Sequence, residues 1–269
     1  EFTEWLSTRS DPGRPFFAFL NYYDTHVPYI PPPGTPPRFG PGPRTFADFH
    51  LLIGMCDKID KATLPTNQLQ LIRDSYDHCL HWLDSQLGAL FTSLQRQRAL
   101  DNTVVIVTSD HGEELGDHGL FEHGESLYRP ETRVPLLVVL PGPARAPLVV
   151  RRSVSLLDLP ATIADLVGLG GKSPFPGRSL SRFWNTPPQA IEEMGAVSEL
   201  AAPNPTDPSH GRSPARDGPL VSLADEDVVY ILNTRNGREQ LFHSTDDPDE
   251  LVDLSKDEEM RSRLERLRS

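Results

Sequence analysis

The amino-acid sequence predicts an α/β fold in which helices are layered on a mostly parallel sheet. Three short runs, at residues 16–20, 104–107 and 136–140, are continuously apolar, as is typical of strands covered on both faces. Between the first two runs, apolar side chains recur every three or four residues from Leu69 to Leu94, which predicts a long helix. A second helix is expected in LLDLPATIADLVGLGG. Strands and helices in this order indicate the layered α/β class.

The boundaries of these elements carry local signals. Asn67, followed by Gln70, predicts a capped start for the long helix. That helix should end before Asp101, so that the next strand begins at Thr103. Gly168 is suited to end the second helix, because glycine readily adopts the left-handed conformation that closes helices.

The chain is expected to have three parts. Residues 1–200 form a partial α/β core, and residues 201–220 form a mobile, proline-rich loop. Residues 221–269 form a small unit of antiparallel strands plus a charged terminal helix. In that unit, two apolar runs flank Asn236-Gly237, a strong signal for a β-hairpin.

Composition excludes some classes of partner. The formal net charge of the 269 residues is -12, which argues against a nucleic acid or an anionic membrane as the main partner. No apolar run approaches the roughly 18 residues of a membrane-spanning helix. Cys56 and Cys79 have neither zinc-site nor redox spacing, so both are expected to be buried thiols.

The stretch TSDHGEELGDHGLFEHG, which begins at Thr108, concentrates histidine, acid and glycine. Asp110 and His111 follow the end of a predicted strand, where ligands gather in open α/β sheets. A carboxylate and an imidazole are both good metal ligands. A strand-end Asp equally often caps a turn, so both interpretations stay open. Glu113 and Glu114, like the nearby Asp117, are expected to be solvated.

Three further histidines are candidates for the same site: two on this loop and one after the first predicted strand. His118 and His123 are on the same loop, but their spacing matches no common zinc module. Asp24 and His26, in NYYDTHVPY, follow the first predicted strand, so they could converge with Asp110 on one cleft. The alternative for that segment is a rigid loop with an exposed histidine.

The ordered set of these segments resembles the sulfatase family, within the alkaline phosphatase superfamily. The resemblance covers nearly the whole chain and is carried by FFAFLNYYDTHVPYIPPP, by RDSYDHCLHWLDSQLGALFTSLQRQRALDNTVVIVTSDHG, by GEELGDHGLFEHGESLYRPETRVPLLVVLPG, by VSLLDLPATIADLVGL with PGRSL, and by GREQLFHSTDDPDELVDLSKD. It implies an alkaline-phosphatase-like mostly parallel sheet flanked by helices, with a small antiparallel C-terminal sheet subdomain.

The resemblance also implies roles for single residues. Asp110 and His111 match the pair that binds the catalytic divalent cation, expected to be Ca²⁺ or Mg²⁺, or Zn²⁺ or Mn²⁺ if the enzyme is phosphate-specific. His26 matches the histidine that contacts the substrate's sulfate or phosphate. His123 falls where many sulfatases have a lysine that also contacts the substrate. Asp24 and His118 are possible supporting residues around the site.

The sequence departs from the family pattern in two ways. It contains no Cys-x-(Pro/Ala)-Ser-Arg segment, whose cysteine becomes the formylglycine nucleophile, and it lacks the first pair of metal-binding acids. The chain therefore resembles a C-terminal portion, and formylglycine is expected only in missing upstream sequence. His123 in place of lysine is found in relatives that use Thr or Ser as nucleophile, which favours phosphate esters.

The expected function is sulfuric ester hydrolysis on a small-molecule or glycan sulfate ester. A phosphodiesterase, phosphatase or phosphoryl transferase of the same superfamily is the alternative. A non-catalytic fragment or interaction module is the alternative from another class. The isolated chain is expected to be inactive because it holds no nucleophile, and family resemblance implies a periplasmic or secreted location.

Overall fold

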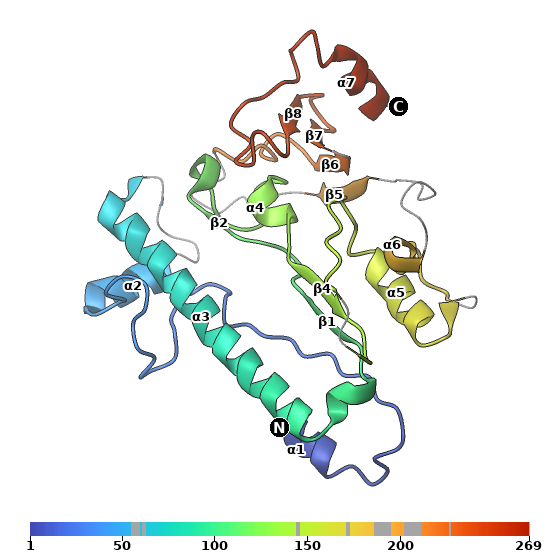
Figure 1. Cartoon of the computed structure of the whole chain (residues 1–269). Helices are drawn as coiled ribbons and strands as arrows, with labels where there is room; N and C mark the ends of the chain where they lie inside the picture. Colours follow the sequence, from blue (N-terminus) through green and yellow to red (C-terminus); the bar gives the residue numbers. More distant parts are fainter. Residues whose placement is uncertain are drawn as a thin grey trace. The chain divides into compact units, whose positions relative to one another are not determined.

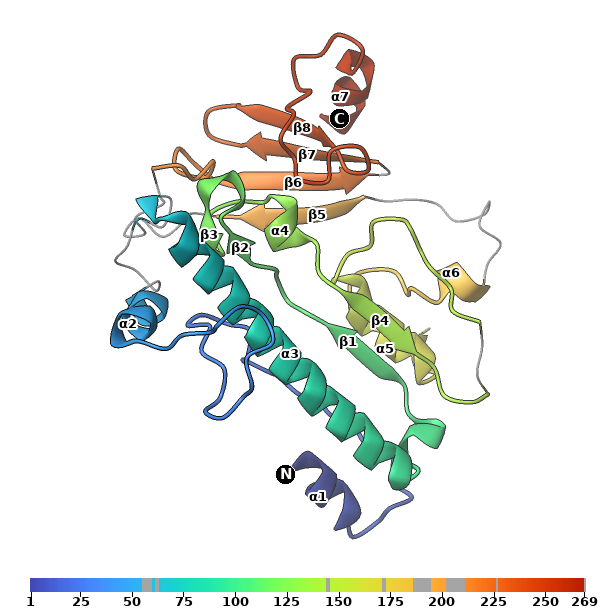
Figure 2. The same ribbon diagram turned by 60° about the vertical axis from the view of Figure 1, so that its left-hand side comes forward.

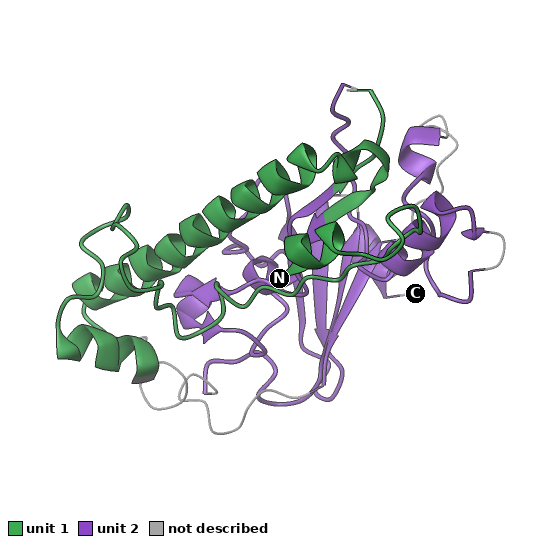
Figure 3. Ribbon diagram, turned by 90° about the horizontal axis from the view of Figure 1, so that it is seen from below, with its two compact units in different colours: residues 1–106, 138–143 green, residues 107–137, 144–269 purple. Residues whose placement is uncertain are grey.

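The protein has an α/β fold with an antiparallel C-terminal sheet, as seen in a computed structural model (Figures 1 and 2). The structure describes residues 1–54, 60, 63–143, 146–170, 173–185, 195–201, 211–225 and 227–268. Contacts divide the chain into two compact units (Figure 3). Unit 1 comprises Glu1–Ile106 and Val138–Pro143, and unit 2 comprises Val107–Leu137 and Ala144–Ser269.

Unit 1 is dominated by one long helix. Its helical elements are α1 (Phe2–Ser7), α2 (Phe46–Gly54), α3 (Thr66–Arg96) and the 3-10 turn η2 (Ala99–Asn102). Helix α3 confirms the predicted helix, and Ile72 and Leu94 of its apolar stripe are buried, whereas Leu80 of the same stripe is 46% exposed. Burial raises the pKa of the Cys79 thiol to about 12, as expected for an inert thiol, whereas Cys56 lies outside the described residues.

The start of α3 differs from the expected cap. The N-cap is Pro65, and its carbonyl accepts hydrogen bonds from the amides of Gln68 (2.9 Å) and Leu69 (3.1 Å). Asn67 therefore lies inside the first turn and caps nothing. Proline is favoured here because its fixed φ directs the chain into the helix without losing a helical hydrogen bond.

The first predicted strand is absent. Residues 16–20 are extended but belong to no described strand, and the side chains of Phe17 and Phe19 are 73% and 80% exposed. A strand exists only where a neighbouring backbone pairs with it, and within the described residues this segment has no such neighbour. The prediction was wrong because apolar composition does not supply a pairing partner.

The other two predicted strands are confirmed. Val105–Thr108 forms β1 and Leu136–Val139 forms β4, and the two are hydrogen-bonded neighbours in a two-stranded sheet. Strand β1 ends two residues before Asp110, so the acid lies just past its carboxyl end, as the sequence predicts.

Unit 2 includes the loop that follows β1. This loop contains a short antiparallel ladder of β2 (Glu114–Leu115) with β3 (Phe121–Glu122), and the helix α4 (Arg129–Thr132) follows it. The second predicted helix is confirmed as α5 (Asp158–Leu166), and Gly168, with φ of +80°, closes it. A further short helix, α6, spans Arg182–Asn185.

The C-terminal sheet has four antiparallel strands in the order β5-β6-β7-β8, side by side in Figure 2. Their bounds are Ala196–Leu200, Leu220–Asp225, Val228–Asn233 and Glu239–His243. The β7–β8 hairpin turns through Asn236-Gly237 as predicted, with Gly237 at φ +72°. The first strand of the sheet thus precedes residue 201.

Alternate residues of β7 enter two separate apolar cores. One core contains Ile231 with Leu120 and Tyr128 from the loop before α4. The other contains Tyr230 and packs beneath the terminal helix α7 (Arg261–Leu267). The sheet therefore anchors the loop that bears the predicted site residues.

The remaining expectations concern the proline-rich loop and membrane-spanning helices. Residues 202–210 of the predicted mobile loop 201–220 lie outside the described residues, whereas residues 211–219 form turns in which Ser213 and Ala215 are buried. Within the part of the chain that the structure describes, no helix is both long and apolar enough to cross a membrane.

Candidate functional site

The structure holds Asp110 and His111 at the end of β1 in a defined local geometry. The Asp110 side chain is 89% exposed, and its Oδ1 accepts a hydrogen bond from the His111 amide at 3.1 Å. His111 Nδ1 lies 2.8 Å from the Gly112 carbonyl oxygen, so Nδ1 carries the proton and donates. The lone pair is then on Nε2, 3.9 Å from Asp110 Oδ2. The Asp110 carboxylate and His111 Nε2 can therefore both coordinate the same ion.

Gly112 fixes this pair against α4. Its amide donates to the Glu131 carbonyl at 2.7 Å. A Cβ atom at position 112 would lie 1.9 Å from the Pro130 carbonyl oxygen, so no larger residue fits without moving the backbone. Glycine is required here for close approach of two backbone segments.

His123 lies beside His111. The centroids of the two rings are 4.1 Å apart, and His123 Nδ1 is 2.8 Å from Glu113 Oε1. The Glu113 side chain is only 6% exposed. The hydrogen bond to Glu113 raises the pKa of His123, partly opposed by burial, so the carboxylate favours the charged imidazolium. Asp110, His111 and His123 thus form one site in unit 2.

A buried acidic cluster holds the loop beneath this site. The Ser126 hydroxyl oxygen lies 3.0 Å from one carboxyl oxygen each of Glu114 and Glu131. Glu131 also accepts hydrogen bonds from the amides of Gly124 (2.8 Å) and Ser126 (3.0 Å). Burial, reinforced by the charge of Glu131, raises the pKa of Glu114 to about 8. Glu114 is therefore a buried, protonated acid at neutral pH.

The expectation that Glu113 and Glu114 are solvated was wrong, whereas Asp117 is exposed as predicted. Glu114 is inaccessible to solvent, and Glu113 pairs with His123. Each acid has a specific partner, which outweighs the cost of burying it. The sequence holds no periodic signal for this, because β2 is only two residues long.

His118 does not join the site. Its ring stacks on Tyr128 with centroids 3.9 Å apart, and burial lowers its pKa, which favours the neutral form. Its φ is +52°, a left-handed conformation at the tip of the β2–β3 turn. These contacts assign His118 a packing role.

His26 and Asp24 lie in unit 1. His26 Nδ1 is 2.8 Å from the Val27 carbonyl oxygen, and its ring lies 4.8 Å from that of Tyr23. Both side chains are partly buried. The expected convergence of His26 with Asp110 stays a prediction, because each unit is described by itself.

Asp110 and His111 carry donor atoms of the kinds that bind divalent cations. The Asp110 carboxylate and His111 Nε2 fit two positions of a metal's coordination shell. Among the described residues, no group of three His, Cys, Asp or Glu side chains is arranged to hold an ion. Asp110 and His111 thus offer two donors, with no third such side chain arranged beside them among the described residues.

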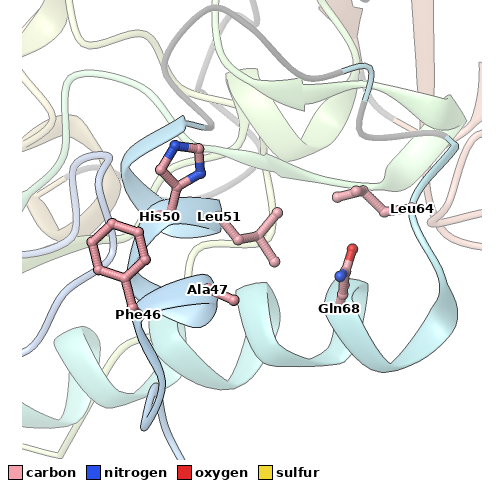
Figure 4. A pocket seen from close by; sticks show the side chains of 6 residues that line it. All are labelled: Phe46, Ala47, His50, Leu51, Leu64 and Gln68. Carbon is pink, nitrogen blue, oxygen red and sulfur yellow. The ribbon is translucent and has the colours of Figure 1, made fainter.

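A separate cavity of about 430 Å³ opens in unit 1 (Figure 4). It is lined by Phe46, Ala47, His50, Leu51, Leu64 and Gln68. Among the described residues that line it, His50 is the one ionisable side chain.

The family model and the curated relatives that match this chain all belong to one family. The family model described as Sulfatase matches residues 1–169. An arylsulfatase from Clostridium perfringens is 24% identical over 97% of this chain and 53% of the relative. A choline-sulfatase from Rhizobium meliloti is 32% identical over 68% of this chain and 33% of the relative. The chain thus spans about half the length, or less, of these curated relatives.

Solved structures agree on the fold. The phosphonate monoester hydrolase of Agrobacterium radiobacter matches 99% of this chain and 57% of its own, with a TM-score of 0.73 and 22% identity. A corresponding enzyme from Silicibacter pomeroyi matches with a TM-score of 0.71 and 24% identity. These likenesses show that the chain has the same fold as the corresponding part of these two hydrolases.

Proposed function

Because this chain belongs to the sulfatase family, we propose that it supplies one half of a sulfuric ester hydrolase site. The observation that supports this most directly is the cluster of Asp110, His111 and the Glu113-paired His123 at the end of β1. In this proposal the nucleophile, a formylglycine, is contributed from outside the described residues. The substrate class is a small-molecule or glycan sulfate ester.

The metal part of the proposal assigns Asp110 and His111 as ligands. When bound, a divalent cation stabilises negative charge on the transferring group and its nucleophile. Ca²⁺ or Mg²⁺ is expected for a sulfatase, and Zn²⁺ or Mn²⁺ for a phosphate-specific enzyme. The Gly112 carbonyl keeps His111 in the tautomer whose Nε2 can coordinate, and the exposed carboxylate of Asp110 needs little desolvation.

The protein's own residues also act on the substrate. Glu113 holds His123 charged and oriented, and the imidazolium stabilises the negative oxygens of a bound ester. His26, from unit 1, is proposed to contact the same ester and assist the leaving group. Both roles require a proton on the ring during binding.

A phosphate ester is the second candidate substrate. The resemblance places His123 where many sulfatases have a lysine, and this departure supports the phosphate alternative. A phosphodiesterase, phosphatase or phosphoryl transferase of the same superfamily would use the same residues. A non-catalytic fragment or interaction module remains the alternative of another class.

Metal titration of the isolated chain tests the proposal without requiring turnover. Isothermal titration with Ca²⁺, Mg²⁺, Mn²⁺ and Zn²⁺ should detect weak binding, and Asp110→Asn or His111→Ala should weaken it by about tenfold or more. Asp217→Asn is the matched control, because Asp217 is an exposed acid beside Arg216 in the same unit. Equal loss in all three variants would refute the assignment.

Turnover assays separate the candidate functions. The isolated chain should hydrolyse neither 4-nitrophenyl sulfate nor 4-nitrophenyl phosphate, since the proposed nucleophile is not within it. Turnover that Asp110→Ala abolishes would place a nucleophile inside these residues and overturn the fragment part of the proposal. In the complete enzyme, the preferred ester decides between sulfate and phosphate.

A further inference from the structure

Glu250, in the loop that follows β8, combines two energetically costly features. It is 2% exposed, and its Oε1 has no hydrogen-bond partner among the described residues. Its φ is +54°, in the left-handed region that is uncommon outside glycine. Burial, reinforced by the charge of Asp247, raises the pKa of Glu250 to about 8, so its carboxyl is neutral at pH 7. An outlier that the surrounding structure maintains at such a cost points to a specific role.

The other carboxyl oxygen of Glu250 holds the start of α4. Oε2 accepts a hydrogen bond of 2.7 Å from the amide of Arg129, which is the first residue of that helix and lies 121 residues away in the sequence. The Arg129 guanidinium in turn donates to the carbonyl oxygen of Ser244, in the same loop as Glu250. Both the backbone and the side chain of Arg129 are therefore fastened to the loop after β8.

Helix α4 is also the element that holds the candidate site. The backbone carbonyl of its residue Glu131 accepts a hydrogen bond from the Gly112 amide at 2.7 Å, and the Glu131 carboxylate accepts one from the Gly124 amide at 2.8 Å. Gly112 directly follows His111, and Gly124 directly follows His123. A displacement of α4 would therefore move the backbone next to both histidines, whose ring centroids lie 4.1 Å apart.

We propose that Glu250 is a positioning residue, which aligns His111 and His123 by fixing α4 to the loop after β8. The inference rests on the proposed function, because that function gives the alignment of the two rings its use. The hydrogen bond to the Arg129 amide requires an acceptor oxygen at a set distance and no negative charge. Glutamine offers the same oxygen at the same distance, whereas aspartate is one methylene shorter and alanine has no acceptor.

NMR of the chain freed of metal with EDTA tests the alignment directly. In the wild type, nuclear Overhauser contacts should join the imidazole protons of His111 and His123, because the two rings are adjacent. Glu250→Ala should abolish these contacts. It should also speed hydrogen exchange at the Gly112 and Gly124 amides by about tenfold or more, relative to the amides of β7. Glu250→Gln should retain the ring contacts and the slow exchange.

Leu264→Ala separates positioning from a general loss of stability. Leu264 is 4% exposed in the core beneath α7, so its truncation destabilises the same unit through the other apolar core. The ring contacts of His111 and His123 should survive in this variant. Circular dichroism shows whether each variant is folded. If Glu250→Ala is not, Glu250→Asp carries the test, because its shorter side chain withdraws the acceptor from the Arg129 amide and should weaken the same ring contacts.

Three outcomes overturn the proposal: ring contacts that survive Glu250→Ala, an equal loss of contacts in Leu264→Ala, or a failure of Glu250→Gln to retain them. These measurements use neither metal nor substrate, so they are independent of the proposed function. Ring contacts that depend on Glu250, in a chain that binds none of the four metals, would refute the metal assignment and leave the positioning role standing. Metal binding that Asp110→Asn weakens, with ring contacts indifferent to Glu250→Ala, would do the reverse.

Discussion

His123 Nδ1 and Glu113 Oε1 lie 2.8 Å apart, and this pair orients the ring that contacts His111. The carboxylate side chain is almost wholly shielded from solvent, so the interaction is screened less than a surface ion pair. Glu113 thus controls both the position and the charge of a candidate substrate-binding histidine.

Removing that carboxylate charge should lower the pKa of His123. In the chain freed of metal with EDTA, Glu113→Gln is expected to lower the pKa of His123, because the largest cause of the upward shift is lost. NMR titration of the imidazole signals measures the value directly. Glu122→Gln removes the charge of a more distant acid and should lower the pKa of His123 less. An equal decrease in both variants would show that the summed charge of the nearby acids, not the hydrogen bond to Glu113, sets the pKa of His123.

Glu114 should make the protein less stable as the pH rises from 4.5 to about 8. In the unfolded chain its carboxyl loses the proton near pH 4.5, whereas in the folded chain the pKa is about 8. The folded state therefore binds more protons between these values, and stability falls as pH rises through the window. Glu114→Gln, a neutral mimic of the protonated acid, should remove this loss.

Thermal unfolding measured from pH 5 to pH 8 tests the role of Glu114. The stability of Glu114→Gln relative to the wild type should improve by on the order of 1–3 kcal/mol across that range. Glu259→Gln, at an exposed glutamate, is the control and should run parallel to the wild type. A constant offset between Glu114→Gln and the wild type at every pH would contradict a neutral Glu114.

Two glycine substitutions should act in opposite directions. Gly112→Ala places a methyl group 1.9 Å from the Pro130 carbonyl and should destabilise by about 2 kcal/mol or more. Gly88→Ala lies within α3 with open space around its Cβ and should stabilise by roughly 0.5–1 kcal/mol. Denaturant titration of both variants measures the two changes, and a neutral Gly112→Ala would mean that the loop is not held against α4.

The start of α5 depends on a buried carboxylate. Asp158 accepts a hydrogen bond from the Arg178 amide at 2.8 Å and pairs with Arg182 Nη2 at 2.9 Å. Asp158→Ala should cost about 2–4 kcal/mol, because Arg182 is left largely buried without this carboxylate. Asp217→Ala breaks the exposed Arg216 pair and should cost less than about 1 kcal/mol. Similar losses in denaturant titrations would argue against a buried pair.

Elements that depend on local pattern were predictable. The stripe on α3, the closure of α5 at Gly168 and the Asn236-Gly237 hairpin follow from side-chain spacing and turn chemistry within a few residues. The position of Asp110 after β1 follows from the same kind of signal. Such features need no knowledge of distant parts of the chain.

Features that depend on distant partners were not predictable. Phe17 and Phe19 have strand composition, but pairing requires a second backbone. Glu114 is buried because Ser126 and Glu131 approach it, and their spacing in sequence follows no regular period. The packing of His118 on Tyr128 likewise depends on a left-handed backbone conformation, which is uncommon outside glycine.

Glu131 closes the site loop into a noncovalent ring. Its backbone carbonyl accepts from the amide of Gly112, and its carboxylate accepts from the amides of Gly124 and Ser126. Both ends of the stretch are thus fastened to one residue of α4, so the loop cannot fray from one end alone. We therefore expect this span to open and close as one cooperative unit, so that His111 and His123 gain or lose their mutual alignment together.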